Sequence, residues 1–170
     1  MPPFGRSYQP FIALLCVWIA IVFIVIAVAT RADRGRVQRA LAGAAAAAIA
    51  NLALDVLAHH FEWWRYPEVS TPFGPLVYYL AAGLGFGALA LLAWRLDRRY
   101  GAKAIAVMIA VMCVYGPIRD HRTQDLIGLI EFRRGAGIIL ADAVLEWVAP
   151  FLVALAAVMR QPRLRAMASS

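Results

Sequence analysis

The chain has 170 residues, of which 63% are hydrophobic, and its mean hydropathy is +0.70. Soluble domains are usually about 45–50% apolar, so this composition excludes an ordinary soluble domain and indicates an integral membrane protein. The net charge of +7 would suggest nucleic-acid binding in a soluble protein. Here the basic residues lie at the ends of apolar stretches, so we expect no nucleic-acid partner and interpret the charge as a topology signal.

Five apolar stretches follow one another, near residues 11–30, 40–60, 75–94, 103–118 and 136–159. A helix needs about 20 residues to cross roughly 30 Å of hydrocarbon, and the alternating segments of a membrane barrel are absent from the sequence. We predict an all-α integral membrane protein in which residues 1–170 form one domain, a compact bundle of five transmembrane helices. The fourth stretch should end at Gly116-Pro117, and segment 123–133 should be interfacial or re-entrant.

Most lysine and arginine residues fall on one side of the expected membrane. They occupy two loops and the C-terminal tail, and cytoplasmic segments carry such an excess. We therefore predict an external N-terminus, a cytoplasmic C-terminus, and a location in the inner (plasma) membrane of a bacterium, in contact with its lipids. The basic residues on this side are Arg31, Arg34, Arg36, Arg39, Arg95, Arg98, Arg99, Lys103, Arg160, Arg163 and Arg165.

Acidic side chains and histidines gather toward the other, outer side. On the second stretch, residues 51, 55, 59 and 62 are spaced by 4, 4 and 3, which places them on one helical face. Asp142 and Glu146 likewise share a face of the fifth stretch. An ionisable residue at bilayer depth costs roughly 2.5–3.5 kcal/mol, so these acids should face the bundle interior, pair, or stay protonated. A carboxyl group that burial keeps protonated can act as a general acid.

We predict one functional site from these residues and the aromatic residues near them. The same side chains also permit structural roles, namely an Asp55–His59 hydrogen bond, acids paired with arginine, and an interfacial aromatic belt. The predicted catalytic residues are Asp55, His59, Asp142 and Glu146. The predicted substrate-binding residues are Asn51, Glu62, Trp63, Trp64, Tyr66, Phe73, Tyr78 and Tyr79.

The cofactor requirement stays open between none and a divalent metal. His59, Asp120 and His121 could supply imidazole and carboxylate ligands for zinc, iron or copper, if different spans bring them together. A haem would need a second-stretch histidine and His121 as its axial pair, and we do not expect one because both lie near the membrane edge.

Small residues and one proline predict how the helices pack. The Ala-rich run 43–50 and the GxxxG pair Gly83 and Gly87 favour close helix approach, within the bundle or in a homo- or hetero-oligomer. Pro150 conflicts with the carbonyl of Glu146, four residues earlier, so we expect the fifth helix to kink there.

The segment LDVLAHHFEWWRYP, followed by STPFGPLVYY, resembles the small integral-membrane carotenoid and terpene cyclases and hydratases. In those proteins a membrane acid precedes a tryptophan-rich turn and a Pro-Phe-Gly segment. The resemblance implies a prenyl substrate that a buried acid protonates, with aromatic faces steadying the carbocation. It is carried by Asp55, Glu62, Trp63, Trp64, Tyr66, Pro72, Phe73 and Gly74.

The function that these features favour is an integral membrane enzyme using buried carboxyl groups for acid–base chemistry on a lipid or isoprenoid. Cyclisation, hydration and isomerisation all fit such a site, and its substrate would be a small hydrophobic molecule. The alternative is a non-catalytic subunit of a larger membrane complex, either a metal- or haem-binding anchor or an assembly partner.

Overall fold

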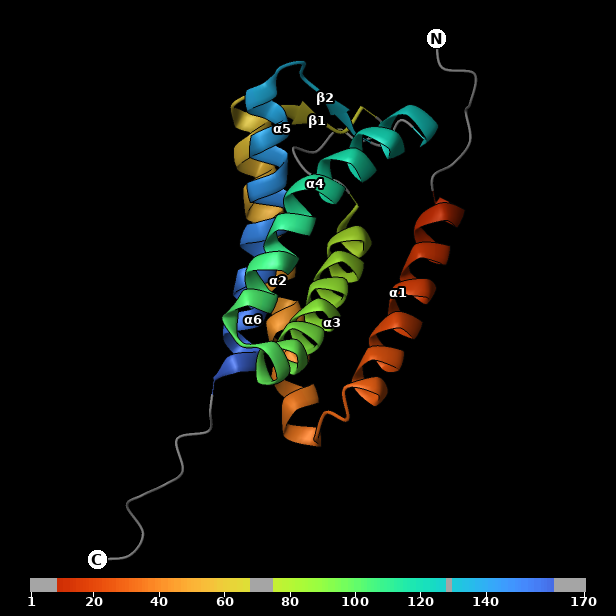
Figure 1. Cartoon of the computed structure of the whole chain (residues 1–170). Coiled ribbons are helices and arrows are strands. Elements are labelled where there is room, and N and C mark those ends of the chain that lie inside the picture. The colour runs from red at the N-terminus through yellow and green to blue at the C-terminus, as the bar shows by residue number, and fades with distance from the viewer. Residues whose placement is uncertain (1–8, 68–74, 128–129, 161–170) are drawn as a thin grey trace, which may run out of the picture.

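The computed structural model describes residues 9–67, 75–127 and 130–160. Five helices in these residues are long and apolar enough to cross a membrane, which confirms the helical bundle expected from hydropathy. They are α1 (Gln9–Ala29), α2 (Arg34–His60), α3 (Leu76–Tyr100), α4 (Ala102–Ile127), and a last helix built from α5 (Ala136–Asp142), η1 (Ala143–Val148) and α6 (Ala149–Met159). Figure 1 shows them side by side, with α1 at one edge.

Helix α2 packs against both α3 and α6, and small residues make this close packing possible. A Cβ atom at Gly43 would lie 2.8 Å from the carbonyl oxygen of Ala154, and one at Gly87 would lie 2.9 Å from that of Ala40. Gly83 faces the backbone of Ala44 even more closely. Gly43, Gly83 and Gly87 are therefore in helix contacts within the chain, whereas Ala45 and Ala46 of the same small-residue run are exposed.

The last helix accommodates Pro150 by widening into a π-helical turn, η1, which ends two residues before the proline. Proline lacks a backbone N–H and crowds the carbonyl four residues earlier. A π-helical turn bonds each N–H to the carbonyl five residues back, as Ala149 does to Val144. The wide turn contains Glu146 and Trp147, so the conflict predicted at this acid is resolved in the helix geometry around it.

Helix α4 does not end at Gly116-Pro117, as we expected from the sequence, but continues to Ile127. A proline inside a membrane helix is tolerated where neighbouring groups compensate for the lost hydrogen bond. Gly116 packs against the Trp147 indole, which a Cβ atom would approach to 2.5 Å. Within segment 123–133, residues 123–127 belong to α4 and Glu131–Phe132 form a short strand.

That strand, β2 (Glu131–Phe132), pairs antiparallel with β1 (Trp64–Arg65) across one end of the bundle. Trp64 lies opposite Phe132, and Arg65 lies opposite Glu131. We call this end the strand end, and the opposite end, which holds the loop between α1 and α2, the basic end. The strands link the segment after α2 to the segment after α4, and they fix Trp64 over the buried polar residues described below.

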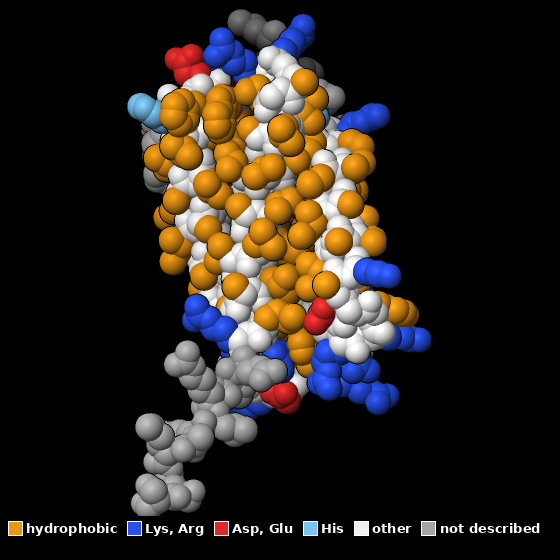
Figure 2. Space-filling view, turned by 60° about the vertical axis from the view of Figure 1, so that its left-hand side comes forward, with side chains coloured by type: hydrophobic (Ala, Val, Ile, Leu, Met, Phe, Trp, Pro, Cys, Tyr) orange, Lys and Arg blue, Asp and Glu red, His pale blue; other side chains and the backbone are white. Residues whose placement is uncertain are grey.

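The surface matches a membrane protein. Figure 2 shows, on the face in view, an apolar band across the middle of the molecule, with Lys, Arg, Asp and Glu toward its two ends. Helix α1 exposes large apolar side chains on its outer face, including Trp18, Ile24 and Val28. At the basic end, Arg36 stacks over the Trp94 ring at 4.5 Å and donates to the Val158 carbonyl at 2.5 Å.

Candidate functional site

Five polar side chains are buried in the half of the bundle nearer the strand end. They come from α2, α4, α5 and η1, and each is at most 6% exposed. Buried polar groups are costly unless they are hydrogen-bonded. A residue whose polar atoms all have partners fits a structural role, whereas one with an unpaired polar atom can bind or react with a ligand. These residues are Asn51, Asp55, Asp120, Asp142 and Glu146.

Asp55 is fully buried and accepts hydrogen bonds from three aromatic residues. Trp64 Nε1 donates to Oδ1 at 2.7 Å, and Tyr66 donates its hydroxyl to Oδ2 at 2.5 Å. The Tyr79 hydroxyl donates to the same oxygen. Burial, with the charge of Asp55 as the next cause, raises the pKa of the Tyr66 phenol well above its usual range, so that phenol remains a donor. Asp55 thus ties α2, β1 and α3 together as a hydrogen-bonded carboxylate.

Glu146 lies close to the carboxyl group of Asp55 in this buried cluster. Asn51 donates from Nδ2 to Oε2 of Glu146 at 3.0 Å, while Oε1 meets no donor among the described residues. Two neighbouring buried carboxyl groups are stable when they share a proton, because a second negative charge there is strongly unfavourable. The arrangement is therefore suited to holding one exchangeable proton.

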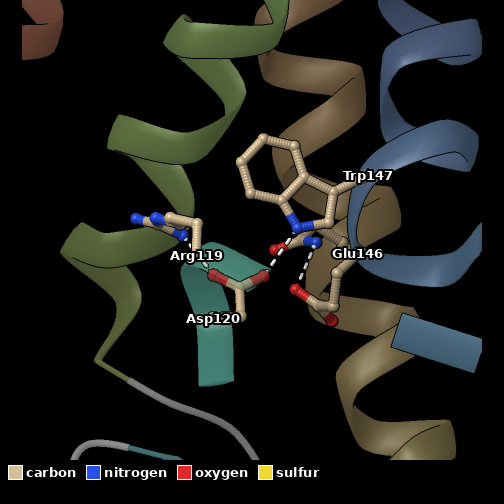
Figure 3. Close-up of polar contacts among 5 residues, drawn as sticks. Arg119, Asp120, Glu146 and Trp147 are labelled. Atoms are coloured by element: carbon tan, nitrogen blue, oxygen red, sulfur yellow. Dashed lines mark hydrogen bonds and ion pairs between the residues drawn. The ribbon is translucent and has the colours of Figure 1, made fainter. Parts of the chain in front are cut away.

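Asp120 is bonded to two groups on the other side of Glu146. Arg119 Nη1 lies 2.5 Å from its Oδ1, and Trp147 Nε1 donates to its Oδ2 at 2.6 Å. Figure 3 shows the carboxyl groups of Asp120 and Glu146 pointing toward one another, with the Trp147 indole beside both. Asp120 and Arg119 compensate each other's charge, so Asp120 is satisfied without a metal ion.

A partly open cavity of about 150 Å³ reaches this cluster from between the helices. Its polar end is formed by Asn51, Arg119, Asp120 and Glu146, and its remaining wall is apolar and aromatic. Trp147 meets Phe86 and Tyr115 edge to face, with ring centroids 6.2 and 6.0 Å apart. The cavity therefore places a buried acid next to aromatic faces. The rest of its lining is Leu15, Ile19, Tyr78, Ala82, Gly85, Phe86, Leu89, Tyr115 and Trp147.

Asp142 is fully buried but lies outside this cavity lining. Neither of its oxygens has a hydrogen-bond donor among residues 9–67, 75–127 and 130–160. His121 packs its ring on Phe132, with centroids 4.5 Å apart. Its buried Nε2 also has no hydrogen-bond partner among these residues. Asp142 and His121 therefore do not line the cavity.

The predicted stripe on α2 is divided by the helix end. Asn51 and Asp55 are buried, whereas His59, in the last turn of α2, and Glu62, just beyond it, are exposed. His59 and Glu62 line a groove at the strand end together with His60 and Arg65. Asp120 is instead bonded to Arg119 and Trp147. The part of the chain that the structure describes contains no group of three or more His, Cys, Asp or Glu side chains that could hold a metal ion.

The aromatic residues predicted to bind substrate have different positions. Tyr78 lines the cavity, whereas Trp64, Tyr66 and Tyr79 hold Asp55. Trp63 is half-buried and stacks on Phe61, with centroids 5.3 Å apart. Phe73 lies outside the described residues. Sequence reasoning missed the cavity residues Phe86, Arg119, Tyr115 and Trp147.

Arg119 and Asp120, two and three residues after Pro117, were the available signal for part of this missed set. An ionisable pair one turn beyond an apolar stretch belongs to the membrane helix if that helix continues, and it must then face the interior. The expected helix end at Pro117 placed both residues outside the span. Trp147, next to Glu146, looked like an ordinary apolar residue of the fifth stretch.

Only the residues quoted in the sequence analysis support the resemblance to membrane cyclases and hydratases. Three of them, Pro72, Phe73 and Gly74, lie outside the described residues. No protein family, curated protein or solved structure matches the chain.

Proposed function

We propose that this protein is an integral membrane enzyme that performs acid–base chemistry on a lipid or isoprenoid, with Glu146 as the group that transfers the proton. The observation that carries the proposal is a buried carboxyl group at the polar end of an otherwise apolar, aromatic cavity. Such a cavity admits an apolar chain and presents it with Glu146, because Asp120, the other acid in the lining, is paired with Arg119. Acid–base catalysis requires that kind of positioned proton donor or acceptor.

The hydrogen-bond partners support Glu146 over Asp55 as the acid. Three donors already occupy the oxygens of Asp55, whereas Glu146 receives one, from Asn51, and keeps an oxygen that meets no donor among the described residues. The proton shared by the two groups then resides on Glu146, where it can hydrogen-bond to Asp55. Asn51 holds the other Glu146 oxygen and fixes the orientation of the acid toward the cavity.

The aromatic wall supports chemistry through a carbocation. Glu146 would give its proton to a carbon–carbon double bond, which leaves a cation on the substrate and a second negative charge on the Asp55–Glu146 pair, and the adjacent cation compensates that second charge. Tyr78, Phe86, Tyr115 and Trp147 line the cavity, and the faces of aromatic rings attract cations. Return of a proton from a neighbouring carbon to Glu146 completes an isomerisation or cyclisation, whereas addition of water and loss of its proton completes a hydration.

In this proposal the strand end faces the exterior and the basic end faces the cytoplasm of a plasma membrane. The basic residues of the α1–α2 and α3–α4 connections lie at the same end of the bundle, which supports this orientation by the positive-inside rule. The site then lies in the outer half of the bilayer, and its substrate is a membrane lipid.

The test compares lipid extracts from membranes containing the wild-type protein, Glu146→Gln or Glu131→Gln. Glutamine keeps the shape of Glu146 but cannot donate an acidic proton. Glu131 is an exposed acid paired with Arg65, so its substitution is the matched control. Mass spectrometry should reveal a lipid change that the wild type and the control produce and Glu146→Gln does not. Identical extracts from all three would refute the proposal and favour a non-catalytic subunit.

A further inference from the structure

We infer that the cavity binds the hydroxyl-bearing end of a long-chain lipid alcohol, and that Asn51 Oδ1 accepts the hydrogen bond from that hydroxyl. Asn51 is 1% exposed, lines the cavity and donates its amide hydrogen to Glu146. Its Oδ1 has no donor among the described side chains. A buried acceptor without a donor costs about 1–3 kcal/mol, so an occupant that donates a hydrogen bond is favoured.

The charges at the polar end favour a neutral donor. Arg119 and Asp120 compensate each other at 2.5 Å, and Glu146 shares a proton with Asp55 in the proposed function, on which this step depends. Asp55 lies outside the cavity lining and is covered by three donors, so an ammonium group in the cavity would not reach its carboxyl group. A phosphate would meet the carboxyl groups of Asp120 and Glu146. A hydroxyl group supplies the one hydrogen that Asn51 needs without adding charge.

The volume and walls of the cavity indicate that only the end of the ligand is enclosed. An engineered protein cavity of about 150 Å³ accommodates benzene, and this one has about the same volume. It therefore holds a group of about six heavy atoms. A longer chain must extend past the apolar side chains of Leu15, Ile19 and Leu89.

The position of α1 gives that chain a route into the bilayer. Helix α1 packs chiefly on α3 and stands at the edge of the bundle in Figure 1, and it contributes Leu15 and Ile19 to the cavity wall. The opposite face of the same helix exposes large apolar residues such as Val17 and Ile24. An apolar tail leaving beside α1 would therefore enter lipid, so the ligand is a membrane alcohol and not a small water-soluble one.

The experiment uses farnesol and farnesyl methyl ether as a matched pair, since the ether has the same chain but no hydroxyl donor. Binding to the full chain in nanodiscs is followed by tryptophan fluorescence, because Trp147 lines the cavity. The wild type should bind farnesol about fivefold more tightly than the ether, as one net hydrogen bond permits. Asn51→Leu should weaken the binding of farnesol but not that of the ether, so that the preference for farnesol disappears.

Gly85→Leu tests the location of the bound probe. Gly85 lines the cavity, and its nearest neighbour in the direction of a Cβ atom is Ile19 at 3.8 Å, so a leucine there should fill the space and block both probes. Ala106→Leu, on an exposed position of α4, should leave binding unchanged. Equal wild-type affinity for both probes, a preference that survives Asn51→Leu, or binding unaffected by Gly85→Leu would each overturn the inference.

These binding measurements need no turnover, so they separate this inference from the proposed function. A farnesol preference that depends on Asn51, together with identical lipid extracts from wild type and Glu146→Gln, would support the ligand class and refute the enzyme. A lipid change that depends on Glu146 without a hydroxyl preference would support the enzyme and refute the ligand class.

Discussion

Replacing Gly83 with alanine should destabilise the bundle, because this residue marks the closest approach of α2 and α3. The added Cβ atom would lie 2.8 Å from Ala48 Cβ and still closer to the Ala44 carbonyl oxygen. Carbon atoms in ordinary contact are about 3.5–4.0 Å apart, so the helices would have to separate by about 0.7–1.2 Å. Overpacking of this kind costs about 1–3 kcal/mol.

The assay is unfolding of the purified protein by SDS in mixed micelles, followed by tryptophan fluorescence. Gly85→Ala is the matched control, because it adds the same methyl group to the same helix, where the nearest atom is 3.8 Å away. Gly83→Ala should lose about 2 kcal/mol of unfolding free energy relative to this control. Equal stabilities for the two variants would refute the packing argument and the assignment of this face to the chain's own interior.

Three further predictions concern the buried network and the π-helical turn. Asp55→Asn should lower the unfolding free energy by about 3 kcal/mol or more, since an amide whose oxygen accepts from Tyr66 and Tyr79 turns its nitrogen, a donor, toward the Trp64 N–H. Asp97→Asn, at a half-exposed position on α3, should change it little in the same assay. Because burial raises the pKa of Tyr66 above the usual 10.0, the folded state keeps a proton that the unfolded state loses, so stability should fall as pH rises above 10.0. Tyr66→Phe should make that pH dependence shallower, and an unchanged slope would contradict it. Pro150→Ala restores a backbone donor, favours an α-helical turn in place of η1 and should reduce the lipid product toward the Glu146→Gln level with little loss of stability; full activity would show that the π-helical turn is not needed.

The sequence predicts the five long helices well, because the length and hydropathy of a membrane-spanning helix are set by the bilayer more than by tertiary contacts. It predicts the end of α4 poorly, because Pro117 is a helix breaker by local rules. The structure continues the helix past Pro117, and Gly116 packs there against Trp147 from a distant part of the chain. Such long-range compensation is not visible in a local pattern.

The candidate site shows the same division between local and long-range information. Helical spacing correctly groups Asn51 with Asp55, but it extends the group to His59, which is exposed in the last turn of α2. Periodicity gives the direction in which a side chain points from the helix. It does not show at which turn of the helix the neighbouring elements end and the side chain becomes exposed. The cavity wall combines α1, α2, α3, α4 and η1, and no spacing rule within one helix brings residues from five elements together.

The number of donors around each acid explains why spacing alone could not distinguish Asp55 from Glu146. Both are buried acids on apolar helices, and either could act as the proton donor in principle. Asp55 receives three hydrogen bonds from β1, the residues after it and α3, which favour a fixed anion that links those elements. Glu146 receives one, from Asn51, and lies at the cavity beside that anion. A proton placed on Glu146 satisfies both acids at once and is the one proton of the pair that a ligand in the cavity can reach.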